Sequence, residues 1–397
     1  MKEEKKLVPK RRFKGFEDHG EWNNAKIGTV VDVYDGTHQT PRYTETGIMF
    51  LSVEDIKSLK SNKFISQEDF ERDFQVSPEA GDVLMTRIGD IGTANVVESN
   101  EPRAYYVSLA LFKSKVLDPY FLKESIHSKP LKKEIWHRTL HIAFPKKINM
   151  NEIEKIEINF PDILEQQKIG QFFKLLDKRI ANQERKIAKV KALKSAYLTE
   201  MFPQEGETVP KRRFKGFEGE WKSRRFSDLA DIVRGASPRP IEDPEWFDKN
   251  SDIGWLRISD VTSQNGRITY LEQRISNIAE EKTRVLNDSH LLISIAATVG
   301  KPVINYVRTG VHDGFLIFLN PKFDIEYMYQ WLEMFRPNWQ RYGQPGSQIN
   351  LNSDIVKNHN VLIPSFIEQQ KIGQFFKNLD DQIATEERKL AKLKAMK

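Results

Sequence analysis

Two small groups of residues have types and spacing that suggest reactive sites. Asp162, Glu165 and Lys168 follow a proline, as the acids and lysine of many nuclease metal sites do. Common nucleases separate the second acid from the lysine by one residue at a strand end, whereas here two residues intervene and a helix is expected to begin. The later copy of this segment has Pro364-Ser365 and lacks the aspartate. Asp118-Pro119-Tyr120-Phe121 similarly suggests an amino-methyltransferase loop but has only one proline. We therefore predict no catalytic role for either group.

Other catalytic motifs are missing from the sequence. His137 and His141, four residues apart, could share a helix face as metal ligands, but the acid needed beside them is absent. No G-x-x-x-x-G-K-[ST] loop for a nucleotide phosphate is present, and no G-x-S-x-G turn for a serine nucleophile. None of these motifs therefore supports catalysis by this chain, although a Ser/His/Asp arrangement built from distant residues stays open.

Composition limits the class of protein further. The chain has 397 residues, of which 39% are hydrophobic and 30% charged, so it is long enough for two or three globular domains. No cysteine is present, which suits a reducing cytoplasm and excludes disulfides. No apolar run is long enough to span a membrane. The net charge of +6 suits a polyanionic partner.

The sequence contains two copies of one plan. Val8 to Glu17 recurs without change as Val209 to Glu218, and each copy precedes a Glu-Trp pair. Glu165 to Lys174 recurs without change as Glu368 to Lys377. Each half thus begins with one tag and ends with one helix, and a period of about 200 residues indicates two homologous domains. In this sequence the second helix copy ends at Lys397, before any counterpart of residues 195–202.

The repeated segment predicts a long helix with a 3.5-residue apolar period in each half. In the first helix the apolar positions are Ile169, Phe173, Leu176, Ile180, Ile187, Val190, Tyr197 and Met201. In the second they are Ile372, Phe376, Leu379, Ile383, Leu390 and Leu393. Gln183 and Lys194 interrupt the first series, and Glu386 replaces Gln183 in the second. We expect the two series to pack against each other, so that the helices form a spacer.

Between tag and helix the halves share an outline of strands and helices. Strands are predicted at Asp32 to Gly36 and Asp231 to Gly235, with others near residues 48–56, 81–89, 104–113, 253–261, 290–296 and 311–319. Amphipathic helices are predicted at 119–136 and 325–339. The expected fold class is therefore α/β, with α+β globules: two homologous domains separated by two long antiparallel coiled-coil helices. The expected boundaries are 1–161 (tag and first domain), 162–202 (central helix), 203–364 (tag and second domain) and 365–397 (C-terminal helix).

These features together resemble the DNA specificity (S) subunit of type I restriction-modification systems, over the whole chain. The most specific is the Glu-Gln-Gln-Lys-Ile-Gly-Gln-Phe-Phe stretch with a Leu-Asp pair soon after it, at Leu176-Asp177 and Leu379-Asp380. The Arg-Phe-x-Gly-Phe tag before a tryptophan and the segment Gly346 to Asn352 are also typical. The first half has a looser version of that segment, at Ala143 to Asn151.

The resemblance implies a non-catalytic subunit with two target recognition domains. Each would read one half of a bipartite, asymmetric site in double-stranded DNA, while the helices set the gap and dock two methyltransferase (M) subunits. Restriction (R) subunits, which combine motor and nuclease, would join this core. S-adenosylmethionine, ATP and magnesium would belong to the partners, so no cofactor or metal is expected in this chain, and the complex would act in the cytoplasm.

The resemblance also suggests where DNA is read, because residues that recognise different bases must lie where the halves differ. The candidates in the first domain are Thr37, His38, Gln39, Thr40, Arg42, Arg87, Lys146 and Lys147. Those in the second are Ser237, Arg239, Arg257, Arg267, Lys301, Gln344, Ser347, Gln348 and Asn350. Arginine, glutamine and asparagine suit base edges, whereas lysine and serine more often contact phosphate.

Two alternative functions stay open from the residues alone. A stand-alone DNA-binding regulator would bind its sequence tightly without partners, although no helix-turn-helix motif is recognisable. A self-sufficient nuclease or methyltransferase would be active as the purified chain, although the motifs for both are missing.

Overall fold

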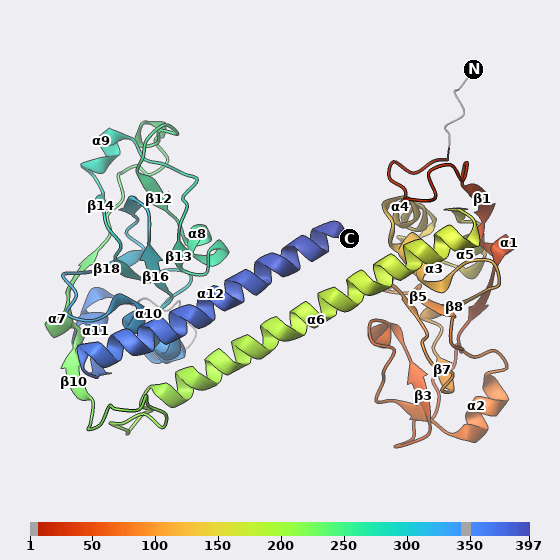
Figure 1. Cartoon of the computed structure of the whole chain (residues 1–397), viewed down its shortest axis with the longest axis horizontal. Helices are drawn as coiled ribbons and strands as arrows, with labels where there is room; N and C mark the ends of the chain where they lie inside the picture. Colours follow the sequence, from red (N-terminus) through yellow and green to blue (C-terminus); the bar gives the residue numbers. More distant parts are fainter. Residues whose placement is uncertain (1–6, 343–350) are drawn as a thin grey trace. The chain divides into compact units, whose positions relative to one another are not determined.

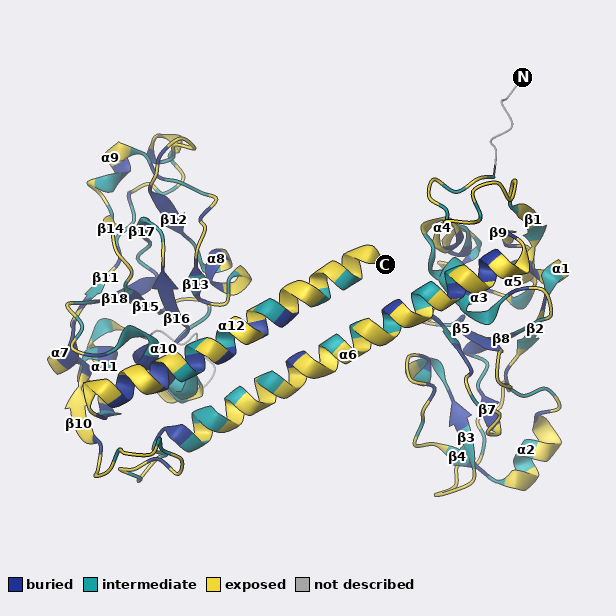
Figure 2. Cartoon of the chain, viewed as in Figure 1, coloured by how far each residue is buried: buried dark blue, intermediate teal, exposed yellow. Residues whose placement is uncertain are grey.

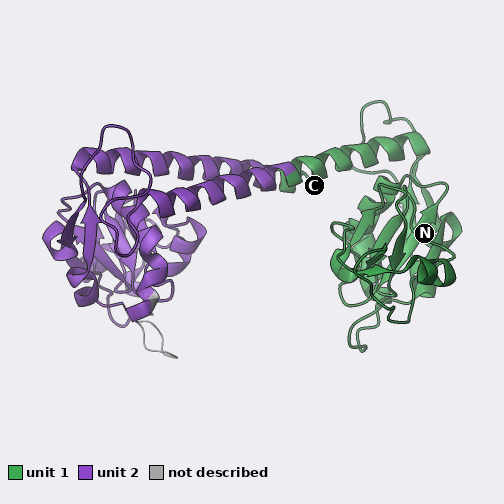
Figure 3. Ribbon diagram, turned by 90° about the horizontal axis from the view of Figure 1, so that it is seen from below, with its two compact units in different colours: residues 1–181, 393–397 green, residues 182–392 purple. Residues whose placement is uncertain are grey.

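The computed structural model describes residues 7–342 and 351–397 (Figure 1). It divides into two compact units, one of residues 1–181 with 393–397 and the other of residues 182–392 (Figure 3). Both units combine helices and strands. One long helix follows each globular domain along the chain: α6 (Ile163–Met201) follows the first, and α12 (Phe366–Met396) follows the second. These helices begin beside the expected positions 162 and 365, whereas the four-part division of the chain stays a prediction. Within the described ranges, no helix combines the length and apolar character needed to cross a bilayer.

Between residues 7 and 161 the first domain contains nine strands. They are β1 (Asn23–Lys26), β2 (Val31–Asp35), β3 (Ile48–Leu51), β4 (Phe64–Ile65), β5 (Val83–Thr86), β6 (Ala94–Val96), β7 (Arg103–Tyr105), β8 (Leu109–Ser114) and β9 (Glu157–Phe160). Its helices are α1 (Ile27–Val30), η1 (Val53–Asp55), α2 (Gln67–Asp73), α3 (Pro119–His127), α4 (Lys129–Arg138) and α5 (Met150–Glu154). The strands form a four-stranded sheet in the order β2-β8-β5-β6, a three-stranded sheet β4-β3-β7 and the pair β1-β9.

The four-stranded sheet has apolar side chains on both faces. Val83 and Met85 of β5 pack in one cluster with residues of α3 and α4, whereas Leu84 packs in another with Phe50 of β3. Because successive side chains of a strand point to opposite faces, a strand covered on both sides is apolar throughout. The sheet is therefore the middle layer, between helices and the small sheet.

The second domain repeats this arrangement. Its strands are β10 (Lys222–Arg225), β11 (Asp231–Arg234), β12 (Gly254–Leu256), β13 (Arg267–Ile268), β14 (Arg284–Leu286), β15 (Leu291–Ser294), β16 (Pro302–Asn305), β17 (Thr309–Val311), β18 (Phe315–Leu319) and β19 (Asn360–Ile363). Its helices are α7 (Phe226–Leu229), η2 (Pro244–Trp246), α8 (Ile258–Ser263), α9 (Asn277–Glu280), α10 (Ile325–Phe335), η3 (Arg336–Tyr342) and α11 (Ser353–Asn358). The sheets are β11-β18-β15-β16-β13, β12-β17-β14 and the pair β10-β19.

Several predicted elements are shorter or divided in the structure. The helix predicted at 119–136 is two helices, because Ser128 is extended and its hydroxyl caps α4 by accepting from the Leu131 amide at 3.4 Å. Pro130 in the first turn of α4 has no amide to continue α3. The strand predicted at 253–261 ends at Leu256, after which α8 begins. Pro337 likewise marks the change from α10 to a 3-10 helix.

In the second unit, the end of α6 and the body of α12 run antiparallel. Contacts pair rising numbers in α6 with falling numbers in α12: Gln183 with Glu386, Lys194 with Asp380 and Tyr197 with Phe375. Gln183 Nε2 donates to Glu386 Oε2 at 2.6 Å and to the Glu386 carbonyl at 3.0 Å. The two polar residues that occupy the same position of the duplicated series therefore bind each other.

Candidate functional site

A bidentate ion pair joins the repeated tag to the repeated helix in each domain. Arg12 Nε and Nη2 donate to Glu165 at 2.8 and 2.6 Å, and Arg213 donates in the same way to Glu368 at 2.7 and 2.8 Å. Both carboxylates are buried. Hydrogen bonding to the glutamate raises the pKa of each arginine. These two arginines therefore attach the tag to its domain.

The glutamine after this glutamate binds the start of a domain helix. Gln166 Oε1 accepts from the Asp118 amide at 2.9 Å, and Gln369 Oε1 accepts from the Asp324 amide at 3.0 Å. Asp118 and Asp324 are the N-caps of α3 and α10. The motif that suggested a methyltransferase loop is therefore a helix cap.

A glycine one turn further along the long helix permits its close approach to the domain. A Cβ at Gly170 would lie 2.3 Å from Asp118 Oδ1, and one at Gly373 would lie 2.6 Å from Asp324 Oδ1. Both distances are well inside van der Waals contact. These unchanged residues of the repeat thus form a clamp that holds each long helix against its domain: Arg12, Glu165, Gln166 and Gly170 in the first domain, and Arg213, Glu368, Gln369 and Gly373 in the second.

The Leu-Asp pair of the repeat completes this attachment. Lys123 Nζ lies 2.5 Å from Asp177, and in the second domain Lys194 Nζ lies 2.5 Å from Asp380. Arg267 Nη2 also contacts Asp380, at 3.1 Å, and Glu326 of α10 at 2.7 Å. Arg267, a DNA candidate, is therefore bound within its domain.

In the first domain, several DNA candidates lie at the sheet edge where β2 and β5 end. Thr37 follows β2 and is held by backbone bonds to Tyr105 and Val107. Gly36 must be glycine here, because a Cβ would lie 2.5 Å from the Tyr106 carbonyl. The next candidates, His38, Gln39, Thr40 and Arg42, are all exposed. This edge therefore presents a row of hydrogen-bonding side chains to solvent.

Arg87 is a buried side chain that connects the two segments at this edge of the sheet. Its side chain is 5% exposed, and Nη2 contacts both carboxylate oxygens of Asp35 at 2.8 Å. Nη1 donates to the Ile148 carbonyl at 3.2 Å. Arg87 thus ties the end of β2 to the segment that carries the exposed Lys146 and Lys147. The structure gives Arg87 a supporting position, whereas the two lysines face solvent.

The corresponding edge of the second domain carries Ser237 and Arg239 after β11. Ser237 Oγ donates to Asp313 Oδ1 at 3.0 Å, and Arg239 Nη2 lies 2.9 Å from Asp313 Oδ2. Burial alone would raise the pKa of Asp313, but the Ser237 hydrogen bond and nearby positive charge lower it below its ordinary value. The Arg239 side chain is 71% exposed, so it reaches solvent while its charge is paired.

The remaining candidates of the second domain differ in position. Arg257 is half-buried and binds Asp260 at 3.1 Å. Lys301 is 9% exposed and binds Asn265 at 2.9 Å, as well as Glu333. Like Arg267, Lys301 is engaged inside the domain. The candidates Gln344, Ser347, Gln348 and Asn350 lie outside the described residues.

Every apolar position predicted for the long helices is buried or half-buried, which produces the stripe seen in Figure 2. The buried ones are Leu176, Ile187, Met201, Ile372, Phe376, Leu379 and Ile383, and the half-buried ones are Ile169, Phe173, Ile180, Val190, Tyr197, Leu390 and Leu393. The two series meet as expected where α6 and α12 run together in the second unit, but α12 also packs against its own domain. Ile372, Phe376 and Leu379 join the core cluster of the second domain, because the start of α12 is held against α10.

Sequence reasoning missed a group of exposed apolar side chains in the first domain. Ile142 and Phe144 are 98% and 104% exposed in the loop that leads to Lys146. Trp136 is 55% exposed, with Lys146 Nζ 4.9 Å from its ring centre. The sequence does contain a signal for this group, because the large apolar residues Ile142 and Phe144 stand in a short segment with the basic residues Lys146 and Lys147.

The residues first considered for catalysis have structural partners. Asp162 caps α6 by accepting from the Leu164 and Glu165 amides at 3.0 Å, and His19 lies 2.8 Å from it and lowers its pKa. His141 Nε2 lies 2.9 Å from the Trp136 carbonyl. Over the ranges that the structure describes, no three histidine, aspartate or glutamate side chains gather as a metal site would require.

Comparison with known proteins agrees with this duplicated architecture. The family model described as the type I restriction modification DNA specificity domain matches twice, over residues 19–192 and 218–395. The crystal structure of a type I restriction-modification S subunit from M. genitalium is similar, with 13% identity, a TM-score of 0.66 and coverage of 98% of this chain and 96% of that one. A second structure, described as showing complex assembly and conformational transition of the type I R-M system, has 16% identity, a TM-score of 0.53 and coverage of 98% and 97%.

The family match covers most of the chain, and each of its two parts runs from the end of a repeated tag, through one recognition domain, into the long helix that follows. Members of this family recognise DNA for type I systems and do not catalyse the reactions themselves. The chain therefore belongs to the type I restriction modification DNA specificity family and is a non-catalytic specificity subunit with two tandem recognition domains.

Proposed function

We propose that each domain reads one half of a bipartite, asymmetric DNA site through the loops at one edge of its main sheet. The observation that carries this proposal is the contrast within the repeat. The clamp residues are identical in both halves, whereas the exposed residues that follow β2 and β11 are different. Two domains attached alike but with different reading loops suit an asymmetric target.

The first domain would use three kinds of exposed side chain to bind its half-site. Gln39 and Arg42 have side chains that suit base edges, and Lys146 and Lys147 suit phosphates. Phe144, fully exposed between basic residues, is a side chain of the kind that wedges between base steps. In the second domain Arg239 is the corresponding exposed contact.

The long helices would set the unread gap between the half-sites. α6 is one unbroken helix of 39 residues, about 58 Å at 1.5 Å per residue. A helix of this length exceeds one turn of B-DNA, roughly 34 Å. This supports a spacer of fixed length.

Two methyltransferase subunits would dock at equivalent places on the two helices. Ile163 and Leu164 at the start of α6 are 45% and 64% exposed, and their counterparts Phe366 and Ile367 on α12 are 51% and 71% exposed. Duplicated exposed apolar pairs suit two identical partners. Restriction subunits would then join, and S-adenosylmethionine, ATP and magnesium would be bound by the partners. The complex would work in the cytoplasm.

The first test is a methylome. The chain is co-expressed with its methyltransferase in a host without other adenine methylation, and modified adenines are mapped by single-molecule sequencing. A split motif with a fixed gap supports two readers and a spacer. An active, bound methyltransferase that yields no split motif contradicts the proposal and favours a stand-alone DNA-binding regulator.

Docking is tested by Leu164→Arg and Ile367→Arg, separately and together. Each single variant should bind one methyltransferase subunit and the double variant none, as measured by native mass spectrometry. Lys189→Arg, on the exposed surface of α6, is the matched control and should bind two. Two subunits on the double variant would place the docking site elsewhere.

A further inference from the structure

The loop between α4 and α5 presents two large apolar side chains to solvent. Ile142 and Phe144 are both fully exposed, so neither packs against the rest of its domain. Leaving side chains of this size in water forgoes the free energy that burial would supply. Two such residues on one short loop therefore indicate a surface that a partner covers.

Backbone hydrogen bonds close this loop at its base. The Leu140 amide donates to the Lys147 carbonyl at 2.7 Å, and the Gly89 amide, from the segment after β5, donates to the Lys146 carbonyl at 2.8 Å. The tip, which includes Phe144, thus projects from a base that is joined at both ends. A loop held in this way loses little conformational freedom when it binds a partner.

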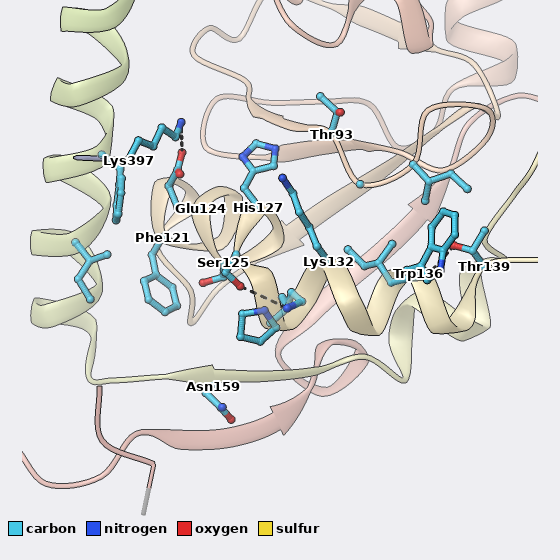
Figure 4. A pocket seen from close by; sticks show the side chains of 18 of the residues that line it. Thr93, Phe121, Glu124, Ser125, His127, Lys132, Trp136, Thr139, Asn159 and Lys397 are labelled. Atoms are coloured by element: carbon cyan, nitrogen blue, oxygen red, sulfur yellow. Dashed lines mark hydrogen bonds and ion pairs between the residues drawn. The ribbon is translucent and has the colours of Figure 1, made fainter. Parts of the chain in front are cut away.

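Trp136 of α4 supports the loop on both sides of its tip. Its ring centre lies 4.2 Å from that of His141, and Lys146 Nζ lies 4.9 Å from the same ring centre. His141 Nε2 also lies 2.9 Å from the Trp136 carbonyl. Figure 4 shows Trp136 together with Thr139 at the end of α4. The residues that flank the tip are therefore both held by one aromatic side chain.

Positive charge surrounds the exposed apolar side chains. The exposed lysines of α4 and of the loop are Lys129, Lys132, Lys133, Lys146 and Lys147. The first three precede Trp136 by seven, four and three residues, so they share its face of α4. Among the described residues, none of the five lysines forms an ion pair with a carboxylate. This charge favours a polyanionic partner.

The loop stands at the sheet edge that carries the exposed residues after β2. The Arg87 guanidinium donates to Asp35, at the end of β2, at 2.8 Å and to the Ile148 carbonyl, beside the loop base, at 3.2 Å. One buried side chain thus holds both segments. A duplex that reaches Gln39 and Arg42 would therefore also meet the tip of the loop.

We propose that Phe144 inserts between two neighbouring base pairs in or directly beside the first half-site, with Ile142 covering the opened step. This inference rests on the proposed reading of DNA by the first domain. The lysines would bind the phosphates on either side, which offsets the loss of stacking between the two base pairs. A pyrimidine followed by a purine unstacks most easily, so the first domain would select such a step by its deformability, in addition to any hydrogen bonds to bases.

The probes are duplexes that carry the motif mapped by the methylome, each with one purine of the first half-site or its flanks replaced by a fluorescent analogue: 2-aminopurine for adenine or 6-methylisoxanthopterin for guanine. Each duplex is titrated with the complex of the full chain and its methyltransferase. Fluorescence should rise at one step with the unchanged chain and with Phe144→Leu, which keeps an apolar wedge, and this rise should be lost with Phe144→Ala. An adenine that the methyltransferase rotates out of the duplex should give its signal in all three complexes.

A nick in one strand at that step separates insertion from an ordinary surface contact, because it keeps both base pairs but makes the stack easier to open. The nick should tighten DNA binding by the unchanged complex about 5-fold or more and leave binding by the Phe144→Ala complex within about 2-fold. Val116→Ala, at another exposed apolar position of the first domain, is the control and should respond as the unchanged chain does. Because Phe144 is fully exposed, its replacement removes no packing contact from the fold.

Equal fluorescence and equal response to the nick in Phe144→Ala and the unchanged chain would overturn the insertion, while a split motif would leave DNA reading by the domain intact. Absence of any split motif with the unchanged chain would instead contradict the proposed function, and the insertion would fall with it. Loss of methyltransferase binding by Phe144→Ala without DNA, measured by native mass spectrometry, would assign the loop to a protein partner and also overturn the inference.

Discussion

At the scale of single residues, the identical parts of the repeat serve attachment and the variable parts face solvent. Arg12, Glu165, Gln166 and Gly170 all contact the start of α3 or hold the tag, and their counterparts do the same in the second domain. Residues with such close contacts tolerate little change, because a shift of a few tenths of an ångström disturbs several partners. Exposed loop residues have no such constraint.

Gly170→Ala should destabilise the first domain. The added methyl group would lie 2.3 Å from Asp118 Oδ1 and push α6 away from the α3 cap, at a cost of about 1–3 kcal/mol in unfolding free energy. The measurement is urea unfolding, compared with Gln171→Ala at the exposed neighbouring position. Equal stability of the two variants would show that α6 does not depend on this close approach.

His127 should make the stability of the first domain depend on pH. Burial lowers its pKa from 6.5 to about 4, and Nε2 accepts from the Ala94 amide at 3.0 Å. The folded pKa is below the unfolded one, so the stabilisation is complete above pH 6.5 and is lost as the pH falls toward 4, by about 2–3 kcal/mol.

His127→Gln, which keeps an acceptor for the Ala94 amide, should remove much of this dependence. The check is hydrogen exchange of residues 83–97 between pH 7.5 and 4.5, corrected for the intrinsic rate. His137→Gln, at an exposed position of α4, is the control and should behave as the unchanged chain. The same loss of protection in both variants would mean that His127 is not the titrating group.

At the scale of elements, each long helix divides its apolar stripe between two partners. The start of α12 belongs to the core of its own domain, and later positions meet the end of α6. The buried Gln183 to Glu386 contact fixes the register of the antiparallel pair, as single buried polar residues do in coiled coils. Hydrogen bonds from Gln183, Lys186 and Lys389 lower the pKa of Glu386 to about 2.

Replacing this polar pair tests its role. Gln183→Leu or Glu386→Leu alone should lower the melting temperature of the second unit, because each places an apolar side chain against the remaining polar one and removes the hydrogen bond between them. The double variant should melt at or above the temperature of the unchanged chain, since apolar residues replace both. Because the pKa of Glu386 is lower in the folded chain, its contribution to the free energy of unfolding is complete above pH 4.5 and is lost as the pH falls toward 2. Additive effects of the two single changes, measured by thermal unfolding at pH 7, would contradict a direct interaction.

At the scale of the whole molecule, the duplication gives one chain two recognition domains, which under our proposal would read two unlike half-sites. The domains carry the same clamp and the same layered fold, so a change in one set of loops leaves the other set unaffected. Net charge of +6 favours association with DNA without specifying sequence.

Substitutions in one domain should therefore alter one half-site only. Gln39→Ala with Arg42→Ala should relax the methylated motif in one half, and Arg239→Ala should relax the other half, each by about 1–3 kcal/mol per lost base contact. Methylome sequencing gives both halves of the methylated motif for each variant, and Lys189→Ala is the control. A change in both halves from either variant would show that the domains do not read independently.

The duplication, the two long helices, the fold class and the family resemblance all follow from the amino-acid sequence, because these depend on local periodicity and on identical stretches. Which charged side chains face solvent depends instead on the folded chain. Arg87, Arg267 and Lys301 have the residue type of DNA contacts, yet each is engaged by a carboxylate from a distant segment. Sequence spacing does not reveal such partners, since ion pairs between distant segments form only when the chain folds.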